Sequence, residues 1–349
     1  MTIDQATVLI TGATGHIGNR VLRCALEHGY KVRAAVRSED KAETLRSMSV
    51  LRNAKDLSFV IVPDFLAQNA FNEAVKGVDY IIHVASPLGT GTPEDGYYDK
   101  YYIEPAVKGI IGMYEAANTA GTIKRIVVTS SIVAIQPLSA VFAESETVFG
   151  PDNRIPEIDG PFDNNFVAYT ASKIAAFNRS EAWVKRHKPT FDVINFHPSF
   201  VFGRDETTTS TKAFAKGTNS LVLAPALGVA MPGFEAAPTN FNSLDQTALA
   251  HVLALNPTIK GNQSFINSTS GQDGFAWSDV NDVVAERFPE DVKSGIFPNT
   301  FTLGSVKAKL DVSKTEETFG YKHAGLEETI VPVFEHYLEL LEKENAALE

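Results

Sequence analysis

The feature of this 349-residue sequence that most constrains its fold is an alternation, along residues 7–198, of short β-branched runs with helical segments. Strands that are apolar throughout must be buried on both faces, and helices between successive strands provide that cover in a parallel sheet. Six such strands predict a doubly wound α/β (Rossmann) fold, which binds ligands at the carboxyl ends of its strands. The predicted strands are 7–12, 31–37, 57–62, 79–85, 125–131 and 191–198, and the predicted helices are 16–29, 39–48, 68–77, 97–121 and 167–187.

The character of the sequence changes near residue 200. Residues 203–233 are rich in Thr, Gly and Pro and lack a clear period, whereas 242–256 and 325–346 are again helical in pattern. We therefore predict a dinucleotide-binding domain over residues 1–200 and a smaller substrate-binding lobe over residues 201–349, with some segments of the lobe returning to the main domain.

The bulk composition excludes several classes of partner. The formal net charge is −11 and the pI is about 5.3, and an acidic surface repels the phosphates of nucleic acids. Cys24 is the single cysteine and lies on the apolar face of a predicted helix, so we expect a buried thiol and a reducing compartment. We expect no signal peptide and no membrane span, hence a cytoplasmic protein, either a monomer or a homodimer.

A glycine-rich loop, "TGATGHIG", separates the first predicted strand from the first predicted helix. Gly12, Gly15 and Gly18 would allow a tight turn and a close approach of the backbone to a pyrophosphate, and the helix N-terminus would add N–H donors. The position of the loop, at the start of a βαβ unit, predicts a dinucleotide site. Asp64, just past the third strand, is either a contact to the adenine amine or a turn residue.

The end of the second strand indicates which dinucleotide is bound. An NAD site usually carries an acidic residue there, about 20 positions after the glycine loop. This sequence has Arg37 and Ser38 at that place and Lys41 one helical turn later, and cations suit the 2′-phosphate of NADP(H). The rival interpretation gives the acidic role for NAD to Glu39 or Asp40, although acids are also favoured in the first turn of any helix.

A phenol and an ammonium group share one face of the helix in "VAYTASKIAAF", because Tyr169 and Lys173 are four residues apart. A nearby cation favours phenolate and lowers the pKa of tyrosine, which would make Tyr169 a usable proton donor. A hydroxyl is still needed to orient a carbonyl oxygen, and the fifth strand offers Ser130 and Ser131 at its carboxyl end. Together with the glycine loop, these groups predict carbonyl–alcohol chemistry.

The motifs "TGATGHIG", "HVAS", "VVTSS", "YTASK" and "HPSFVFG" resemble those of the extended short-chain dehydrogenases/reductases. The sequence "LEHGYKVRAAVRSEDKAETL" is similar to the dihydroflavonol-reductase-like branch and, within it, to fungal NADPH-dependent aldehyde and ketone reductases. The resemblance implies that Ser131 is the catalytic serine, Tyr169 the acid and Lys173 its partner. Ala106 stands where many members of the wider family have an asparagine, so a proton relay through that side chain is not expected.

The resemblance also implies a set of residues around NADP(H). Ala85 and Ser86 of "HVAS" would flank the cofactor, and Pro198 and Ser199 of "HPSFVFG" would lie against the nicotinamide carboxamide. The expected cofactor-binding residues are Gly12, Thr14, Gly15, His16, Ile17, Gly18, Arg37, Lys41, Asp64, Ala85, Ser86, Thr129, Tyr169, Lys173, Pro198 and Ser199.

These features predict an NADPH-dependent carbonyl reductase, an oxidoreductase acting on a small or medium apolar ketone or aldehyde. Two alternatives are an NAD-dependent sugar-nucleotide epimerase or dehydratase and a non-catalytic NADP-sensing regulator. His16, His83 and His197 lack metal-ligand spacing and are interpreted as structural, so no metal is expected. The aromatic residues that flank the catalytic segments either line a substrate pocket or pack in the core: Phe162, Phe166, Phe200 and Phe202.

Overall fold

A computed structural model describes residues 6–86, 93, 97–141, 143–231, 235–269 and 275–348. The chain divides into two compact units. The first unit comprises residues 1–138, 151–197 and 248–265, and the second comprises 139–150, 198–247 and 266–349.

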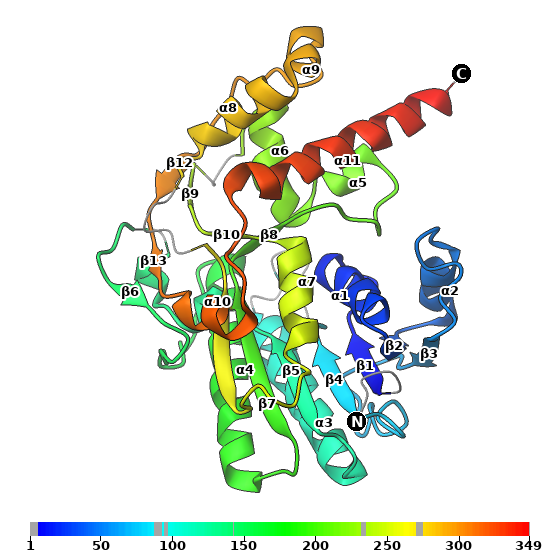
Figure 1. Cartoon of the computed structure of the whole chain (residues 1–349). Helices are drawn as coiled ribbons and strands as arrows, with labels where there is room; N and C mark the ends of the chain where they lie inside the picture. Colours follow the sequence, from blue (N-terminus) through cyan, green and yellow to red (C-terminus); the bar gives the residue numbers. More distant parts are fainter. Residues whose placement is uncertain are drawn as a thin grey trace. The chain divides into compact units, whose positions relative to one another are not determined.

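The first unit is built on one large sheet, which has seven strands in the described part of the chain. Its strands are β1 (Thr7–Thr11), β2 (Lys31–Val36), β3 (Leu57–Ile61), β4 (Tyr80–His83), β5 (Arg125–Thr129), β7 (Asp192–Pro198) and β11 (Gln263–Asn267). Their order is β11-β7-β5-β4-β1-β2-β3, and the pairs β1–β2, β1–β4, β2–β3, β4–β5 and β5–β7 are all parallel (Figure 1). The predicted doubly wound fold is confirmed.

Both faces of this sheet are covered, as continuous apolar strands require. Successive side chains of a strand point to opposite faces, and in β1 both Leu9 and its neighbours Val8 and Ile10 are fully buried. Leu9 belongs to a core cluster that includes Met113 and Trp183. The helices associated with this unit are α1 (His16–Glu27), α2 (Glu39–Ser47), α3 (Glu104–Ala120), α4 (Asn165–His187) and α7 (Leu244–Leu253).

Local signals in the sequence explain where several of these helices begin and end. The Ser38 hydroxyl accepts from the Lys41 amide and starts α2. The Asn164 side chain accepts from the amides of Phe166 and Val167 at the start of α4. Helix α3 ends at Gly121, whose φ of 67° lies in the left-handed region that favours glycine.

Two predicted helices are corrected by the structure. Residues 68–77 form a chain of turns, in which Ala70, Asn72 and Lys76 each bond to the carbonyl three residues earlier. The apolar period there was genuine, since Phe71 is buried in the core, but periodicity does not specify the hydrogen-bond pattern. The helix predicted over 97–121 instead begins with a π-helical turn over Asp99–Ile103, and α3 follows.

The second unit has a core of its own, centred on large aromatic side chains that include Phe202, Trp277 and Phe334. Its strands form three parallel pairs, β8–β10, β9–β12 and β6–β13. The strands are β6 (Val148–Phe149), β8 (Phe200–Phe202), β9 (Ala236–Pro238), β10 (Phe241–Ser243), β12 (Gly304–Val306) and β13 (Lys309–Leu310). The helices are α5 (Thr211–Phe214), α6 (Ser220–Ala226), α8 (Ser278–Arg287), α9 (Pro289–Ser294), α10 (Ser313–Phe319) and α11 (Leu326–Ala346). Among the described helices of both units, none combines the length and the apolar character that crossing a bilayer requires.

Candidate active site

The glycine loop lies between β1 and α1 and is shaped by close backbone contacts. Gly12 has a φ of 75°, and a Cβ there would approach the Ala85 amide nitrogen to 2.8 Å. A Cβ at Gly18 would collide with the Gly12 carbonyl oxygen. Gly15 is the N-cap of α1, and no side chain caps the helix there. The first N–H groups of α1 therefore have no side-chain partner, and the turn before them is packed too closely for any residue but glycine at positions 12 and 18. Thr14 belongs to this loop, and His16 and Ile17 are the first two residues of α1.

The predicted cations lie together at the end of β2. Arg37 directly follows the strand and is exposed, and Lys41 is exposed in the first turn of α2. Ser38 lies between them and caps that helix. The rival acid Glu39 is held by Arg46, whose Nη1 donates to its Oε1 at 2.5 Å.

Asp64 acts as a turn residue in this structure. Its Oδ1 accepts from the Leu66 amide at 2.8 Å, and its carbonyl accepts from the Ala67 amide at 3.3 Å. These bonds fix the carboxylate two residues past Val62, which follows β3. A contact from Asp64 to adenine remains a prediction.

The structure brings the Tyr169 and Ser131 side chains together. Burial raises the pKa of the Tyr169 phenol, and a hydrogen bond with the Ser131 side chain acts in the opposite direction. Ser131 is placed by its role as N-cap of a 3-10 turn, Ile132–Ala134, where its Oγ accepts from the Val133 amide. The expected lowering of the phenol pKa is not seen, because burial dominates in this structure.

Lys173 lies one turn further along α4 and is also enclosed. Its Nζ lies 5.7 Å from the centroid of the Tyr169 ring and donates to Ser86 Oγ at 3.1 Å. Burial lowers the pKa of Lys173 from 10.5 to about 8. Ser86 follows β4, so the lysine joins helix α4 to the carboxyl end of the sheet.

A further set of side chains, which the sequence did not single out as a group, supports these residues. The Thr11 hydroxyl accepts from the Ala85 amide at 3.1 Å and lies 3.0 Å from His83 Nδ1. Burial, together with the charge of Lys173, lowers the pKa of His83 to about 4, so His83 is neutral at pH 7. Thr11 ends β1 and His83 ends the paired strand β4. Their shared place at the ends of two strands is the sequence signal that could have identified this pair.

Two more histidines hold the carboxyl ends of β5 and β7. His197 Nδ1 donates to the Ser131 carbonyl oxygen at 3.2 Å, and burial lowers the pKa of His197 to about 3. Thr129 Oγ1 lies 2.8 Å from His251 Nε2. His197 therefore positions the backbone of the candidate serine, a structural role that agrees with its interpretation from the sequence.

Some predicted residues belong to the second unit. Pro198 is the last residue of β7, and the Ser199 amide donates to the Asn267 carbonyl at 3.1 Å. Phe202 is a core residue of that unit. Within the first unit, the ring centroid of Phe166 lies 6.4 Å from that of Tyr169. Phe162 packs in a cluster with Tyr98 and Ala171, and Phe200 packs against the core around Phe202.

The doubly wound sheet, with a glycine loop between its first strand and first helix, defines the class of Rossmann-fold proteins. The sequence model of the NAD dependent epimerase/dehydratase family matches residues 8–256. The chain belongs to this family of extended short-chain dehydrogenases/reductases, which confirms the predicted family resemblance.

Its relatives include several fungal proteins. The chain is 43% identical to the ketoreductase CTB6 of Cercospora beticola over 350 residues, which is 97% of each chain. It is 32% identical to the NAD-dependent epimerase/dehydratase ALT6 of Alternaria alternata, over 95% of this chain and 97% of that one. The yeast methylglyoxal/isovaleraldehyde reductase Gre2, solved with NADPH, shares the fold with a TM-score of 0.80 at 24% identity, over 96% and 99% of the two chains.

Proposed function

We propose that this protein is an NADP(H)-dependent carbonyl reductase that converts a ketone or aldehyde to an alcohol. The observation that carries the proposal is the grouping of Tyr169, Ser131 and Lys173 at the carboxyl end of the sheet, where the partly buried phenol lies beside a buried hydroxyl and a buried ammonium group. The 43% identity to a ketoreductase over nearly the whole chain supports the same conclusion.

The residues of the glycine loop fit a dinucleotide. Gly12 and Gly18 allow a tight turn in which a Cβ would collide with backbone atoms, and no side chain caps the first N–H groups of α1, which leaves them available to a phosphate. NADP(H), when bound, supplies the hydride. Arg37 and Lys41 would bind its 2′-phosphate, because both cations are exposed at the end of β2, while Glu39 is already paired with Arg46.

In the proposed reaction, the carbonyl carbon gains the hydride and the carbonyl oxygen gains a proton from Tyr169. Ser131 donates a hydrogen bond to that oxygen, which orients the substrate and stabilises the developing charge. Lys173 would bind the ribose hydroxyls of the dinucleotide and would stabilise the tyrosinate that remains. The phenol then recovers its proton from solvent, and the alcohol leaves.

The test is a set of three variants assayed with NADPH and a panel of aryl ketones and aldehydes. Tyr169→Phe should lower kcat by about 10²–10⁴-fold, the usual contribution of a positioned acid, while NADPH affinity stays near that of the parent. Ser131→Ala should lower kcat by about 10²-fold, and its matched control Ser130→Ala should stay close to the parent. Tyr169→Phe with full activity would show that the proton donor lies elsewhere.

The same assay separates the alternatives. Absence of NADPH consumption with every carbonyl compound, together with tight NADPH binding, would favour a regulator. A dinucleotide that remains bound through gel filtration and is oxidised and reduced in each turnover would favour an epimerase. Multiple-turnover consumption of NADPH with formation of alcohol is the outcome that the proposal requires.

Cofactor choice has its own test at the end of β2. Arg37→Gln should raise the Kd for NADPH by about 10–100-fold, the effect of losing one charge-assisted hydrogen bond, with little change for NADH. The matched control is Glu39→Gln, which should change neither Kd, because Glu39 is engaged by Arg46. A loss of NADH affinity in Glu39→Gln, with no effect in Arg37→Gln, would assign the site to NAD.

A further inference from the structure

Thr11 and His83 form a buried polar pair at the carboxyl ends of two neighbouring strands. They are register partners on the parallel strands β1 and β4, so their side chains lie side by side on one face of the sheet. Leu9 and Ile81, two residues earlier on each strand, share that face and belong to the apolar core cluster that contains Phe71. The pair lies at the end of this apolar layer and is enclosed, with exposed fractions of 0% for Thr11 and 5% for His83.

The hydrogen bonds of this pair determine which ring nitrogen of His83 carries the proton. Thr11 Oγ1 accepts from the Ala85 amide at 3.1 Å and lies 3.0 Å from His83 Nδ1. A hydroxyl has one proton to donate, and among the described residues the Thr11 hydroxyl has no partner besides these two. The arrangement that satisfies every group is the Nε2–H tautomer of His83, in which Nδ1 accepts the Thr11 hydroxyl proton.

The Ala85 amide belongs to the segment that binds Lys173. Ala85 and Ser86 follow β4, and Ser86 Oγ accepts from Lys173 Nζ at 3.1 Å. In the described part of the chain, Thr11 Oγ1 is the only side-chain atom that bonds to the backbone of residues 84–86. The orientation of the Thr11 hydroxyl therefore controls where this segment, and with it Ser86, lies.

Lys173 depends on Ser86 for its polar contact. The lysine is 7% exposed, and Ser86 Oγ is the one hydrogen-bond acceptor of its ammonium group within the described residues. A buried ammonium group is disfavoured unless hydrogen bonds replace its hydration. The position of Ser86 therefore affects both the stability of the charged lysine and its placement beside the Tyr169 ring, whose centroid is 5.7 Å from Nζ.

We propose that His83 is a positioning residue for Lys173. By accepting the Thr11 hydroxyl proton, it holds the Thr11 oxygen toward the Ala85 amide and so keeps Ser86 where it binds the lysine. The acceptor atom, rather than the imidazole ring, carries this role. The catalytic consequence rests on the proposed function, because a displaced Lys173 supports Tyr169 less well, but the placement of the lysine can be measured without turnover.

The first test is a 13C NMR titration of the full chain labelled with [ε-13C]lysine, in which the Lys173 signal is identified by its absence in Lys173→Met. His83→Leu should raise the acid dissociation constant of Lys173 about tenfold, because the ammonium group loses its bond to Ser86, and its pKa should fall below the present value of about 8. Ser86→Ala should lower this pKa at least as far. His83→Asn should keep it near 8, since the asparagine Oδ1 can replace Nδ1 as the acceptor.

The second test is turnover of an aryl ketone at saturating NADPH. His83→Leu and Thr11→Val should each lower kcat about tenfold, the effect of one lost hydrogen bond, while KM for the ketone stays within about threefold of the parent. The double variant should be no slower than the slower single variant, because both changes break the same series of bonds. His83→Asn and Thr11→Ser, which keep the acceptor and the hydroxyl, should stay close to the parent.

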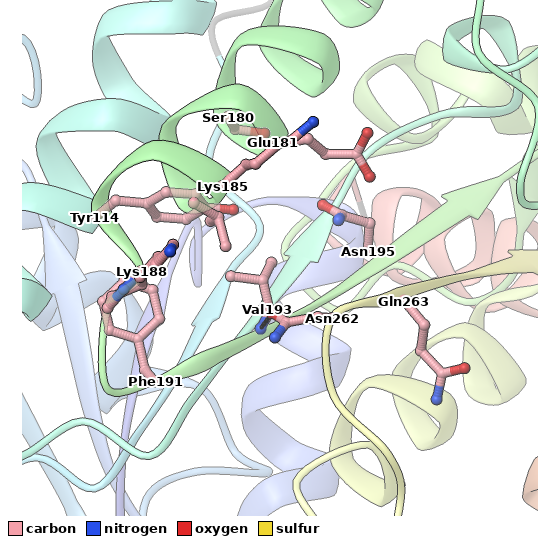
Figure 2. Close-up of a pocket in the computed structure, with 12 residues that line it drawn as sticks. Tyr114, Ser180, Glu181, Lys185, Lys188, Phe191, Val193, Asn195, Asn262 and Gln263 are labelled. Atoms are coloured by element: carbon pink, nitrogen blue, oxygen red, sulfur yellow. Dashed lines mark hydrogen bonds between the residues drawn. The ribbon is translucent and has the colours of Figure 1, made fainter.

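Ser180→Ala is the matched control for a loss of stability. Ser180 lies on α4, seven residues after Lys173, and is 1% exposed. Its hydroxyl bonds to the Phe177 carbonyl at 2.9 Å and to the hydroxyl of Tyr114 (Figure 2). Its removal should lower Tm, as His83→Leu does, but should leave kcat and the pKa of Lys173 as they are in the parent.

Three results would overturn the proposal. They are a pKa of Lys173 in His83→Leu equal to that of the parent, equal impairment of His83→Asn and His83→Leu, and fully additive losses of kcat in the double variant. If His83→Leu does not fold, the titration of Thr11→Val, which keeps the shape of the side chain, decides in the same way. If the parent consumes no NADPH with any carbonyl compound, the proposed function fails, and the titration still decides whether His83 places Lys173.

Discussion

Two cationic side chains are buried at opposite ends of the large sheet, and their partners differ. Arg125 begins β5 and is 4% exposed, and it donates to both carboxylate oxygens of Asp192 and to the carbonyls of Ala254, Asn256 and Ile259. All five N–H groups of its guanidinium are thus used. Lys173, at the carboxyl end, is 7% exposed and donates to Ser86 alone within the described residues.

This difference separates a charge that stabilises the fold from one that is available to a ligand. A buried ion is tolerated when its partner and its hydrogen bonds offset the loss of hydration. Arg125 meets that condition within the chain itself. Lys173 does not, and burial lowers its pKa to about 8, so the folded protein holds its ammonium group at a cost in free energy. Incomplete pairing of this kind is typical of functional sites.

The largest effect is expected at the amino end of the sheet. Arg125→Met should lower the free energy of unfolding by about 3–5 kcal/mol, because it leaves the Asp192 carboxylate and three carbonyl groups without their partner. The matched control is Arg46→Met, which removes an exposed pair with Glu39 and should cost less than about 1 kcal/mol. Urea denaturation measures both. Equal losses in the two variants would show that the complete pairing of Arg125 stabilises the fold no more than an exposed ion pair does.

The sequence could not have indicated the Arg125 network. Its carbonyl partners lie 129 to 134 residues away, in a segment whose backbone turns after α7, and no residue type marks a carbonyl as an acceptor. The fit also depends on Gly261, because a Cβ there would collide with the Asp192 side chain. Such an arrangement depends on tertiary packing, which the local periodicity of the sequence does not predict.

The sheet and the first helices were predictable because their signals are local. β1, α1, β2 and α2 begin at the predicted residues, and a serine cap or a glycine loop marks each helix start. The helix predicted over 68–77 failed because an apolar face fits both an α-helix and a series of turns. At the candidate site, the spacing of Tyr169 and Lys173 predicted their shared face, but the link from Lys173 to Ser86 spans 87 residues and required the fold.

The second prediction concerns the incompletely paired cation. Lys173→Met keeps a side chain of similar length but removes the buried charge, so it should raise the free energy of unfolding at pH 7 by about 1–3 kcal/mol. The gain should shrink between pH 8 and pH 10.5, because over that range the parent lysine becomes neutral first in the folded state and then in the unfolded state. Under the proposed function, turnover should fall by about 10²-fold or more. If Lys173→Met is less stable than the parent and fully active, then Lys173 stabilises the fold, as Arg125 does, and does not serve a ligand.

The third prediction concerns the neutral histidines beside this site, whose effect appears only below pH 6.5. Burial lowers the pKa of His83 to about 4 and that of His197 to about 3, against about 6.5 in the unfolded chain. Above pH 6.5 neither the folded nor the unfolded state binds these protons, so the two histidines do not lower the free energy of unfolding there. As the pH falls below 6.5, the unfolded state takes up protons that the folded state binds only near pH 4 and pH 3, so each histidine should cost about 2 kcal/mol at pH 5. Urea denaturation at pH 7 and pH 5 measures the loss.

His197→Asn should remove roughly half of this pH dependence, since asparagine can still donate to the Ser131 carbonyl but does not titrate. Lys173→Met should reduce the remaining part, because the Lys173 charge contributes to the low pKa of His83. If both variants lose stability between pH 7 and pH 5 as the parent does, the acid sensitivity arises elsewhere, and the low pKa values of these histidines do not govern it.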